Sequence, residues 1–218
     1  MAINDLQLRR DIEAELDWDS RFDSRQIGVA VKNGVVALSG YVGSYAQKRA
    51  AEEAVQSVSG VRAIANDILI ELPATARRTD AELAETVLAA LHGNVSVPAE
   101  RIRVFVRDGW ITLEGEVVLW FQKSAAEAAV SPLPGVKGIS NNIVINAHAS
   151  IEDVKTKIED ALRRRAQLDA RNITVTATQG TVTLAGEVHS WGERQQAEAA
   201  AWQAPGVSKV IDQITVRP

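Results

Sequence analysis

Apolar and polar residues alternate over 27–31 and again over 36–42, the pattern of two β-strands that each bury one face. Asn33 and Gly34 lie between the two stretches. An Asn-Gly pair accepts the positive φ angles of a tight two-residue turn. The segment is therefore predicted to form a β-hairpin whose apolar side chains face the same way.

Stretches with helical spacing flank this hairpin. Leu6, Ile12 and Leu16 are predicted to lie on the buried face of a first helix. An alanine-rich stretch at 44–58 predicts a second helix, and alternation around Ile68 predicts a last strand. Because alanine is small, the second helix can pack closely against the sheet. The predicted order of elements is α-β-β-α-β.

The whole pattern occurs three times along the chain. The hairpin is "VKNGVVALSGYV" at 31–42, "VRDGWITLEGEV" at 106–117 and "ATQGTVTLAGEV" at 177–188. We expect recurring glycines to serve the backbone at the hairpin turn, after the second strand and at the end of the second helix. These glycines are Gly34, Gly40 and Gly60, then Gly109, Gly115 and Gly135, then Gly180, Gly186 and Gly206. Agreement at so many positions indicates internal repeats.

The repeats predict an α+β protein of three tandem αββαβ modules, each a small three-stranded sheet packed by two helices. Module 1 is assigned to residues 1–72, module 2 to 80–147 and module 3 to 151–218. Residues 73–79 and 148–150 are the linkers between them. The order of the strands within each sheet stays open at this point.

Some contacts within the modules are predicted as well. Thr79 and Ser150 each precede a first helix and are expected to act as N-caps. Asn66, Asn141 and Asp212 enter the last strand at one repeated position. A polar side chain at the same place in three copies predicts a hydrogen bond at a turn or bulge inside each module.

Composition and charge exclude several classes of protein. Hydrophobic residues make up 46% and charged residues 24% of the chain, which is typical of a globular protein. The net charge of -4 provides no general positive field for nucleic acid, and the absence of cysteine excludes disulfides and thiolate metal sites. The chain has no long apolar run of membrane-spanning length, and its start, "MAINDLQLRRDIEAEL", has no apolar signal segment. These features predict a cytoplasmic protein without a transmembrane segment.

The repeated unit resembles the BON domain, named for bacterial osmotic-shock and nodulation proteins. The resemblance rests on "GVVALSGYV" with "GVRAIANDILI", "GWITLEGEV" with "GVKGISNNIVI", and "GTVTLAGEV" with "GVSKVIDQITV". It implies a binding module without a reaction or a cofactor, transport-associated and linked to osmotic stress, for which phospholipid binding is the usual proposal. It also implies an alternative, because a cytoplasmic relative with a single such domain binds potassium.

One aromatic position recurs and is a candidate contact with lipid or a partner. Tyr45, Trp120 and Trp191 start the second helix of each module, and Phe121 adds another ring in module 2. These rings either pack against the sheet or present an amphipathic surface to a lipid headgroup region or another protein.

A run of basic residues is a candidate for electrostatic attachment. Arg163, Arg164 and Arg165 lie at the end of the first helix of module 3, where cations also complement the helix dipole. Module 1 has more acidic than basic residues, whereas module 3 has equal numbers of the two. We therefore expect an anionic surface to be met by the C-terminal part of the chain.

Metal and catalytic sites are not predicted. His92, His148 and His189 occupy unmatched positions in the repeat, and the chain has no nucleotide-binding loop or catalytic triad motif. Asp17 and Asp19 lie in an acidic loop that is either solvated or part of a cation site. The sequence thus favours a non-enzymatic protein that binds anionic phospholipid or an envelope partner. A potassium-type cation sensor and a protein–protein scaffold remain as alternatives, and the oligomeric state stays open.

Overall fold

The computed structural model describes residues 4–146, 154–164, 172–178, 180–204 and 206–217. The elements of module 1 are α1 (Asp5–Trp18), η1 (Ser24–Gln26), β1 (Ile27–Lys32), β2 (Val35–Val42), α2 (Tyr45–Ser57), β3 (Ala63–Asn66) and β4 (Leu69–Ile70). A short helix, η2 (Ala74–Ala76), follows in the linker. Module 2 contains α3 (Asp80–Gly93), η3 (Ala99–Arg101), β5 (Ile102–Arg107), β6 (Trp110–Val117), α4 (Trp120–Val130) and β7 (Gly138–Ile145). Module 3 contains α5 (Val154–Arg164), β8 (Ile173–Thr178), β9 (Thr181–Val188), α6 (Trp191–Trp202) and β10 (Lys209–Val216).

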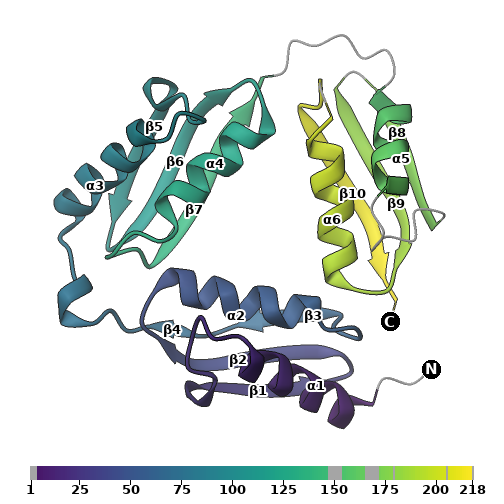
Figure 1. Ribbon diagram of the computed structural model, residues 1–218, viewed down its shortest axis with the longest axis horizontal. Helices are drawn as coiled ribbons and strands as arrows, with labels where there is room; N and C mark the ends of the chain where they lie inside the picture. The colour runs from purple at the N-terminus through teal and green to yellow at the C-terminus, as the bar shows by residue number, and fades with distance from the viewer. Residues whose placement is uncertain (1–3, 147–153, 165–171, 179, 205, 218) are drawn as a thin grey trace. The chain divides into compact units, whose positions relative to one another are not determined.

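The protein is α+β, with one small mixed sheet in each of three modules (Figure 1). In every module the second strand lies in the centre of the sheet. It pairs antiparallel with the first strand through the hairpin and parallel with the last strand. The second helix makes the crossover that a parallel pair requires. This settles the strand order that the sequence left open.

Module 1 differs from the predicted three-stranded sheet. Its last strand is divided into β3 and β4, which both pair with β2. The division falls at Asp67 and Ile68, where the backbone N–H of Ile68 is bonded to the Asn66 side chain at 3.3 Å. The Ile68 side chain still enters the core. β7 and β10 run through the corresponding positions as continuous strands.

A carboxylate at the start of the first helix anchors the hairpin turn in modules 1 and 2. Asn33 and Asp108, each with φ of 52°, precede glycines that also have positive φ, as the Asn-Gly and Asp-Gly pairs predict. The carboxylate of Asp5 accepts bonds from the N–H groups of Asn33 and Gly34 at 2.7 and 3.0 Å. Asp80 does the same for Asp108 and Gly109 at 2.8 and 3.0 Å. The helix and the hairpin of each module are thereby tied together.

The second glycine of each hairpin is fixed by a close backbone approach. Gly40, Gly115 and Gly186 have φ of 112°, 146° and 139°. A Cβ on any of them would overlap the carbonyl oxygen of the residue just before the first strand. Because glycine has no side chain, the central strand can lie directly against the backbone that precedes the first strand.

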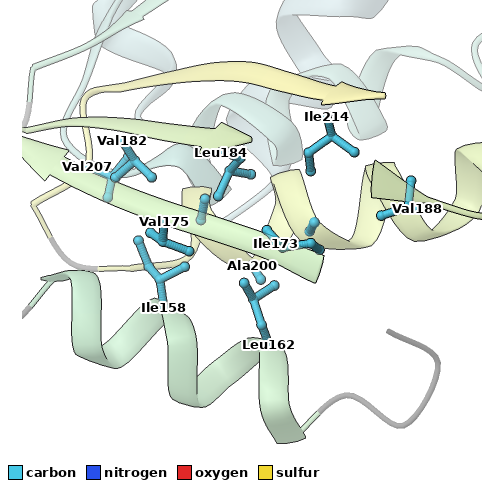
Figure 2. Packing of buried hydrophobic residues seen from close by; sticks show 12 residues of the cluster. Ile158, Leu162, Ile173, Val175, Val182, Leu184, Val188, Ala200, Val207 and Ile214 are labelled. Atoms are coloured by element: carbon cyan, nitrogen blue, oxygen red, sulfur yellow. The ribbon is translucent and has the colours of Figure 1, made fainter. Parts of the chain in front are cut away.

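The core of each module lies between its sheet and its two helices. In module 3 it contains Ile158 and Leu162 from α5, Val175 from β8, Leu184 from β9 and Ala200 from α6 (Figure 2). Burying aliphatic side chains in this way stabilises each module by roughly 25 cal/mol per Å² of apolar surface. The equivalents of Ile158, Leu162 and Leu184 are buried in modules 1 and 2 as well. Val29 and Val104, the equivalents of Val175, are half-buried.

The first helix of module 1 corrects one prediction. Leu8, Ile12 and Leu16 are buried, whereas Leu6 is exposed. Leu8 lies one full turn before Ile12, so its side chain reaches the same face, whereas Leu6 points to solvent. In module 2 the predicted Leu83 is buried, as expected.

Side chains cap the first helices as the pattern indicates. Thr79 forms a capping box with Glu82 at the start of α3, and Asn4 accepts bonds from Leu6 and Gln7 at the start of α1. The third predicted cap, Ser150, lies outside the described residues. The second helices end at or before the predicted residues, with positive φ at the glycine that follows each of them.

Candidate functional site

The recurring aromatic residues Tyr45, Trp120 and Trp191 each begin the second helix of a module. All three residues are half-buried. The guanidinium of Arg194, one turn further along α6, lies 4.8 Å from the centre of the Trp191 ring, a cation–π contact. The Trp191 ring therefore packs against a side chain of its own helix. The assignment of the three rings to a contact with lipid or a partner stays a prediction.

Module 2 adds exposed apolar side chains around this position. Val118, Leu119 and Phe121 are 40%, 42% and 48% exposed. Together with Trp120 they form what we call the apolar loop, residues 118–121. Val118 and Leu119 connect β6 to α4, and Trp120 and Phe121 are the first two residues of α4. The corresponding residues are Gly43, Ser44 and Ala46 in module 1 and His189, Ser190 and Gly192 in module 3. The recurring aromatic position predicted Trp120 and Phe121 but not Val118 and Leu119, although the unbroken apolar run after the strand distinguishes module 2.

The basic run of module 3 is only partly described. Arg163 and Arg164 belong to the last turn of α5. Their side chains, and the whole of Arg165, lie outside the part of the structure that is described. Their assignment to an anionic surface stays a prediction.

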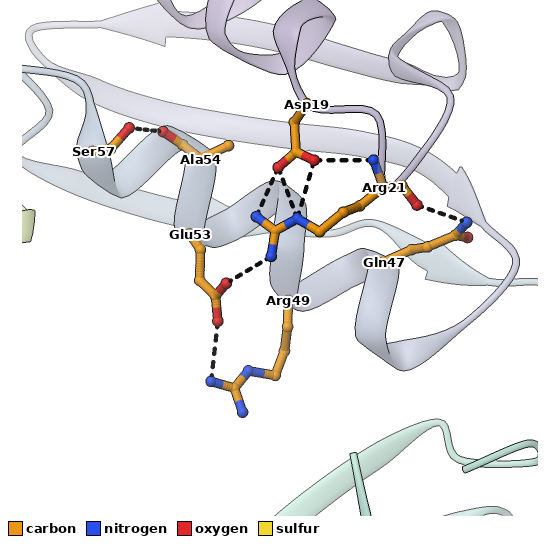
Figure 3. Close-up of polar contacts among 7 residues, drawn as sticks. All are labelled: Asp19, Arg21, Gln47, Arg49, Glu53, Ala54 and Ser57. Atoms are coloured by element: carbon orange, nitrogen blue, oxygen red, sulfur yellow. Dashed lines mark hydrogen bonds and ion pairs between the residues drawn. The ribbon is translucent and has the colours of Figure 1, made fainter. Parts of the chain in front are cut away.

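The acidic loop of module 1 is shorter than predicted, because Asp17 belongs to α1. The acidic residues after the helix are paired with arginine side chains. Asp19 accepts bonds from Nε and Nη2 of Arg21 at 3.0 and 2.7 Å, and Arg21 also contacts Glu53 (Figure 3). The Arg21 side-chain hydrogen bond holds the pKa of Asp19 below its usual value. Asp23 is paired with Arg25 in the same way. Carboxylates neutralised by arginine are poor ligands for a cation, and the described residues include no group of three metal-binding side chains.

The polar residue repeated in the last strand links that strand to the second helix. Asn141 donates to the Lys123 carbonyl oxygen at 3.0 Å and to the Glu127 carboxylate at 3.2 Å, while its own oxygen accepts from Ile143 at 3.4 Å. Asn66 makes the equivalent bond to Glu52 at 2.8 Å. The predicted hydrogen bond within each module is thus confirmed, and its role is structural.

In module 3 an ion pair replaces this link. Asp212 accepts from Nε of Arg194 at 2.6 Å and from the backbone N–H of Ile214 at 2.9 Å. Both charged side chains are mostly buried. Modules 1 and 2 therefore share a link from an amide to a carboxylate. In module 3 the last strand supplies the acceptor, and the donor lies one helical turn earlier.

The face of the module 2 sheet that the helices leave open bears a second group of exposed aromatic residues. Trp110 and Phe105 are about half exposed, and they line a shallow depression of about 470 Å³ with Arg107, Thr112 and Lys137. Asp108 completes the lining. We call this surface the Trp110 face. The repeat pattern gives Trp110 little weight, because no other module has an aromatic residue at that position.

A larger groove adjoins the Trp110 face. It has a volume of about 980 Å³ and is lined by residues 70–74 and 77–80, by the hairpin turn at Asp108 and Gly109, and by Gly135 and Lys137. Asp108 and Lys137 belong to both surfaces, so that the two are continuous. Arg77 and Arg78 contribute further cations to the groove.

The corresponding faces of the other modules have different chemistry. Module 3 has threonines at the positions of Phe105, Arg107, Trp110 and Thr112, which are Thr176, Thr178, Thr181 and Thr183. Module 1 has mostly small residues there, among them Gly28, Ala30 and Ala37. The exposed face, unlike the core, is therefore specific to each module.

Comparison with known proteins identifies the repeats. The model of the BON domain matches residues 4–71, 79–147 and 150–218. The osmotically-inducible protein Y of Escherichia coli (strain K12) is 26% identical over 145 residues, covering 65% of this chain and 72% of that protein.

Two solved structures are also similar over most of the chain. One is of CdsD, a structural protein of the type III secretion system of Chlamydia trachomatis, with 16% identity over 97% of this chain and 93% of that one. The other is the C-terminal domain of CdsD, with 15% identity over 99% of this chain and all of that one. The TM-score is 0.27 for both, too low to bear on function.

Proposed function

The chain belongs to the BON domain family, and we propose that it is a non-catalytic protein that attaches peripherally to anionic phospholipid surfaces during osmotic stress. Its similarity to a protein named for osmotic induction supports the stress setting. None of the described helices combines the length and apolar character needed to cross a membrane.

The apolar loop of module 2 carries this proposal. Large apolar side chains at a loop tip are suited to the boundary between headgroups and acyl chains, because they leave water without exposing unpaired backbone groups to lipid. Trp120 brings an amphipathic ring to the same place, and tryptophan is favoured at that depth. Gly43 and Ser44 of module 1 offer nothing comparable, so module 2 is the part we assign to insertion.

Electrostatic attraction is assigned to Arg163, Arg164 and Arg165. Each basic residue near an anionic surface contributes about 1 kcal/mol, so the run alone gives weak attachment and needs the apolar loop as a second contact. We place the protein in the cytoplasm, at the anionic inner leaflet, and cell fractionation tests that location.

Co-sedimentation with vesicles tests the proposal. The full chain is expected to pellet with vesicles containing phosphatidylglycerol, and not with pure phosphatidylcholine, at near-physiological salt. The variant Val118→Gly/Leu119→Ser/Phe121→Ala, which substitutes the module 1 residues, should bind at least about tenfold more weakly through lost apolar burial. Replacing all three arginines with alanine should also weaken binding and flatten its salt dependence.

The control is Val95→Ser, which removes a fully exposed apolar side chain elsewhere in module 2. It should bind as the unaltered chain does. If the chain stays in the supernatant with every vesicle, the lipid proposal fails. If it forms oligomers that the loop variant abolishes, the loop is a protein contact and the scaffold alternative replaces the proposal.

A further inference from the structure

We propose that the Trp110 face of module 2 binds a nucleoside phosphate, with the base stacked on Trp110 and the phosphates held by Lys137 and Arg78. This inference is independent of the proposed lipid attachment. Trp110 begins β6 and the apolar loop follows its end, so the two surfaces are separated by the length of the strand, roughly 23 Å at about 3.3 Å per residue.

The first argument is the way in which the Trp110 ring is held. The ring lies over Gly138 of the neighbouring strand, where any Cβ would overlap it. Its indole N–H donates to the Ser140 hydroxyl at 2.9 Å. The ring is therefore fixed over the sheet, yet half of its surface remains exposed. A ring that is held in place and accessible loses little conformational entropy when a planar ligand stacks on it.

The second argument is that the three residues of this arrangement, Trp110, Gly138 and Ser140, are particular to module 2. The positions of Trp110, Gly138 and Ser140 are occupied by Val35, Ala63 and Ala65 in module 1. In module 3 they are occupied by Thr181, Lys209 and Ile211. Module 2 thus combines an aromatic ring, a glycine beneath the ring and a hydroxyl that accepts its N–H. Modules 1 and 3 have other residues at all three positions. Packing of the module does not require them.

The third argument is the charge beside the ring. The Lys137 side chain runs over the hairpin turn, where a Cβ on Gly109 would lie 3.1 Å from Lys137 Cγ. The Arg78 side chain covers Gly135, where a Cβ on that glycine would lie 3.1 Å from Arg78 Cβ. Its Nη1 donates to the carbonyl oxygens of Thr75 and Arg77 at 3.0 and 2.8 Å. Arg107 lies next to Trp110 in the sheet. Cations therefore extend from the ring into the adjoining groove.

These features together select the ligand class. A planar base stacks on an exposed indole irrespective of its hydrogen-bonding edge, and phosphates bind lysine and arginine as point charges or through paired donors. An uncharged aromatic ligand would leave the cations unused, and inorganic phosphate would leave the ring unused. The carboxylate of Asp80 is engaged by the N–H groups of Asp108 and Gly109. The Asp108 carboxylate lies 3.9 Å from Arg107 in an exposed pair, so the phosphates are assigned to Lys137 and Arg78 and not to Arg107.

Isothermal titration calorimetry on the full chain tests the inference with ADP, adenosine and pyrophosphate. ADP is expected to bind at least about tenfold more tightly than either fragment, because only ADP engages both the ring and the cations. Trp110→Thr, which introduces the residue found at this position in module 3, should weaken ADP binding by about tenfold or more. Lys137→Ser, which also introduces the module 3 residue, should lower the affinity for ADP and leave that for adenosine unchanged.

The matched control is Trp18→Ala, which removes an 85% exposed tryptophan from α1 of module 1. It should leave ADP binding unchanged. Since module 3 folds with threonine and serine at the substituted positions, loss of binding in these variants reports on the site. The inference is overturned if ADP does not bind at millimolar concentration, if adenosine or pyrophosphate binds as tightly as ADP, or if Trp110→Thr binds normally.

Discussion

Modules 2 and 3 bury most of the same positions and differ mainly at the positions that tie elements together or face solvent. Leu113 and Leu184 occupy the same place in the central strands, and both are fully buried. Outside the core, Asn141 of module 2 corresponds to Asp212 of module 3, and the aromatic open face corresponds to a threonine-rich one. A common fold is thus maintained by a small set of aliphatic and glycine positions, while polar links change in compensating ways.

The link between the last strand and the second helix demonstrates this compensation. In module 2 the Asn141 amide donates to Glu127, whereas in module 3 Asp212 accepts from Arg194. Replacing Asn141 with aspartate alone would place its carboxylate beside that of Glu127. The arginine removes that conflict because it approaches from the preceding turn of the helix.

The largest expected effect comes from breaking this link in module 3. Asp212→Ala leaves the mostly buried Arg194 guanidinium without its carboxylate and removes the acceptor for the Ile214 N–H. We expect a loss of about 2 kcal/mol in the free energy of unfolding of module 3, against about 1 kcal/mol for Asn141→Ala in module 2, where the bonds involve a neutral amide. Hydrogen exchange with mass spectrometry on the full chain resolves the effect by module.

The double variant Arg194→Lys/Asp212→Asn sharpens the same comparison. It introduces the residues of module 2 at both positions, and Glu198 corresponds to Glu127. Exchange in β10 should return towards that of the unaltered chain. Equal exchange in Asp212→Ala and Asn141→Ala would show that the ion pair adds nothing over the neutral link.

A smaller effect is expected from the anchor of the hairpin turn. Asp80→Ala removes the acceptor for two backbone N–H groups, and we expect module 2 to lose about 1 kcal/mol of stability, as for the loss of a helix cap. Module 3 has Ile151 at the corresponding position, and isoleucine offers no acceptor. Faster exchange at the β5–β6 turn, with unchanged exchange in module 1, is the expected result. Unchanged exchange at that turn would contradict the role of Asp80.

The smallest effect concerns pH. The backbone and side-chain hydrogen bonds from Thr79 lower the pKa of Glu82 below its usual 4.5. Because the pKa of Glu82 is lower in the folded protein, the stabilisation of α3 by the capping box is fully present above pH 4.5. It is lost as the pH falls through the pKa of Glu82 in the folded protein. Module 1 has Gln7 at this position and should not respond.

A carboxyl NMR titration between about pH 6 and pH 3 measures the effect. The midpoint for Glu82 is expected below 4.5, with fraying of the first turn of α3 over the same range. Glu82→Gln should remove the pH dependence of that turn and leave the rest of the module unaffected. A midpoint at or above 4.5 would contradict the capping role.

The candidate site was predictable in part. The register of the repeat brought out Tyr45, Trp120 and Trp191, because they recur. The same reasoning gave little weight to Trp110, because a comparison between copies finds only the residues that the copies share. Trp110 does not recur in the other modules. The apolar run at 118–121 was visible in the sequence. Its exposure was not predictable, because it depends on how β6 and α4 pack at the point where the strand ends.

The sequence by itself determined the order of elements, the repeat and most of the core, because alternation, helical spacing and turn chemistry act over a few residues. Asn33 and Gly34 define their turn locally, and Ile12 and Leu16 define a face of their helix. Only the tertiary structure decided the strand order, the exchange of Leu6 for Leu8 in the core, and the placing of Gly138 beneath Trp110. These depend on contacts between residues distant in sequence, whose geometry exists only once the strands have paired.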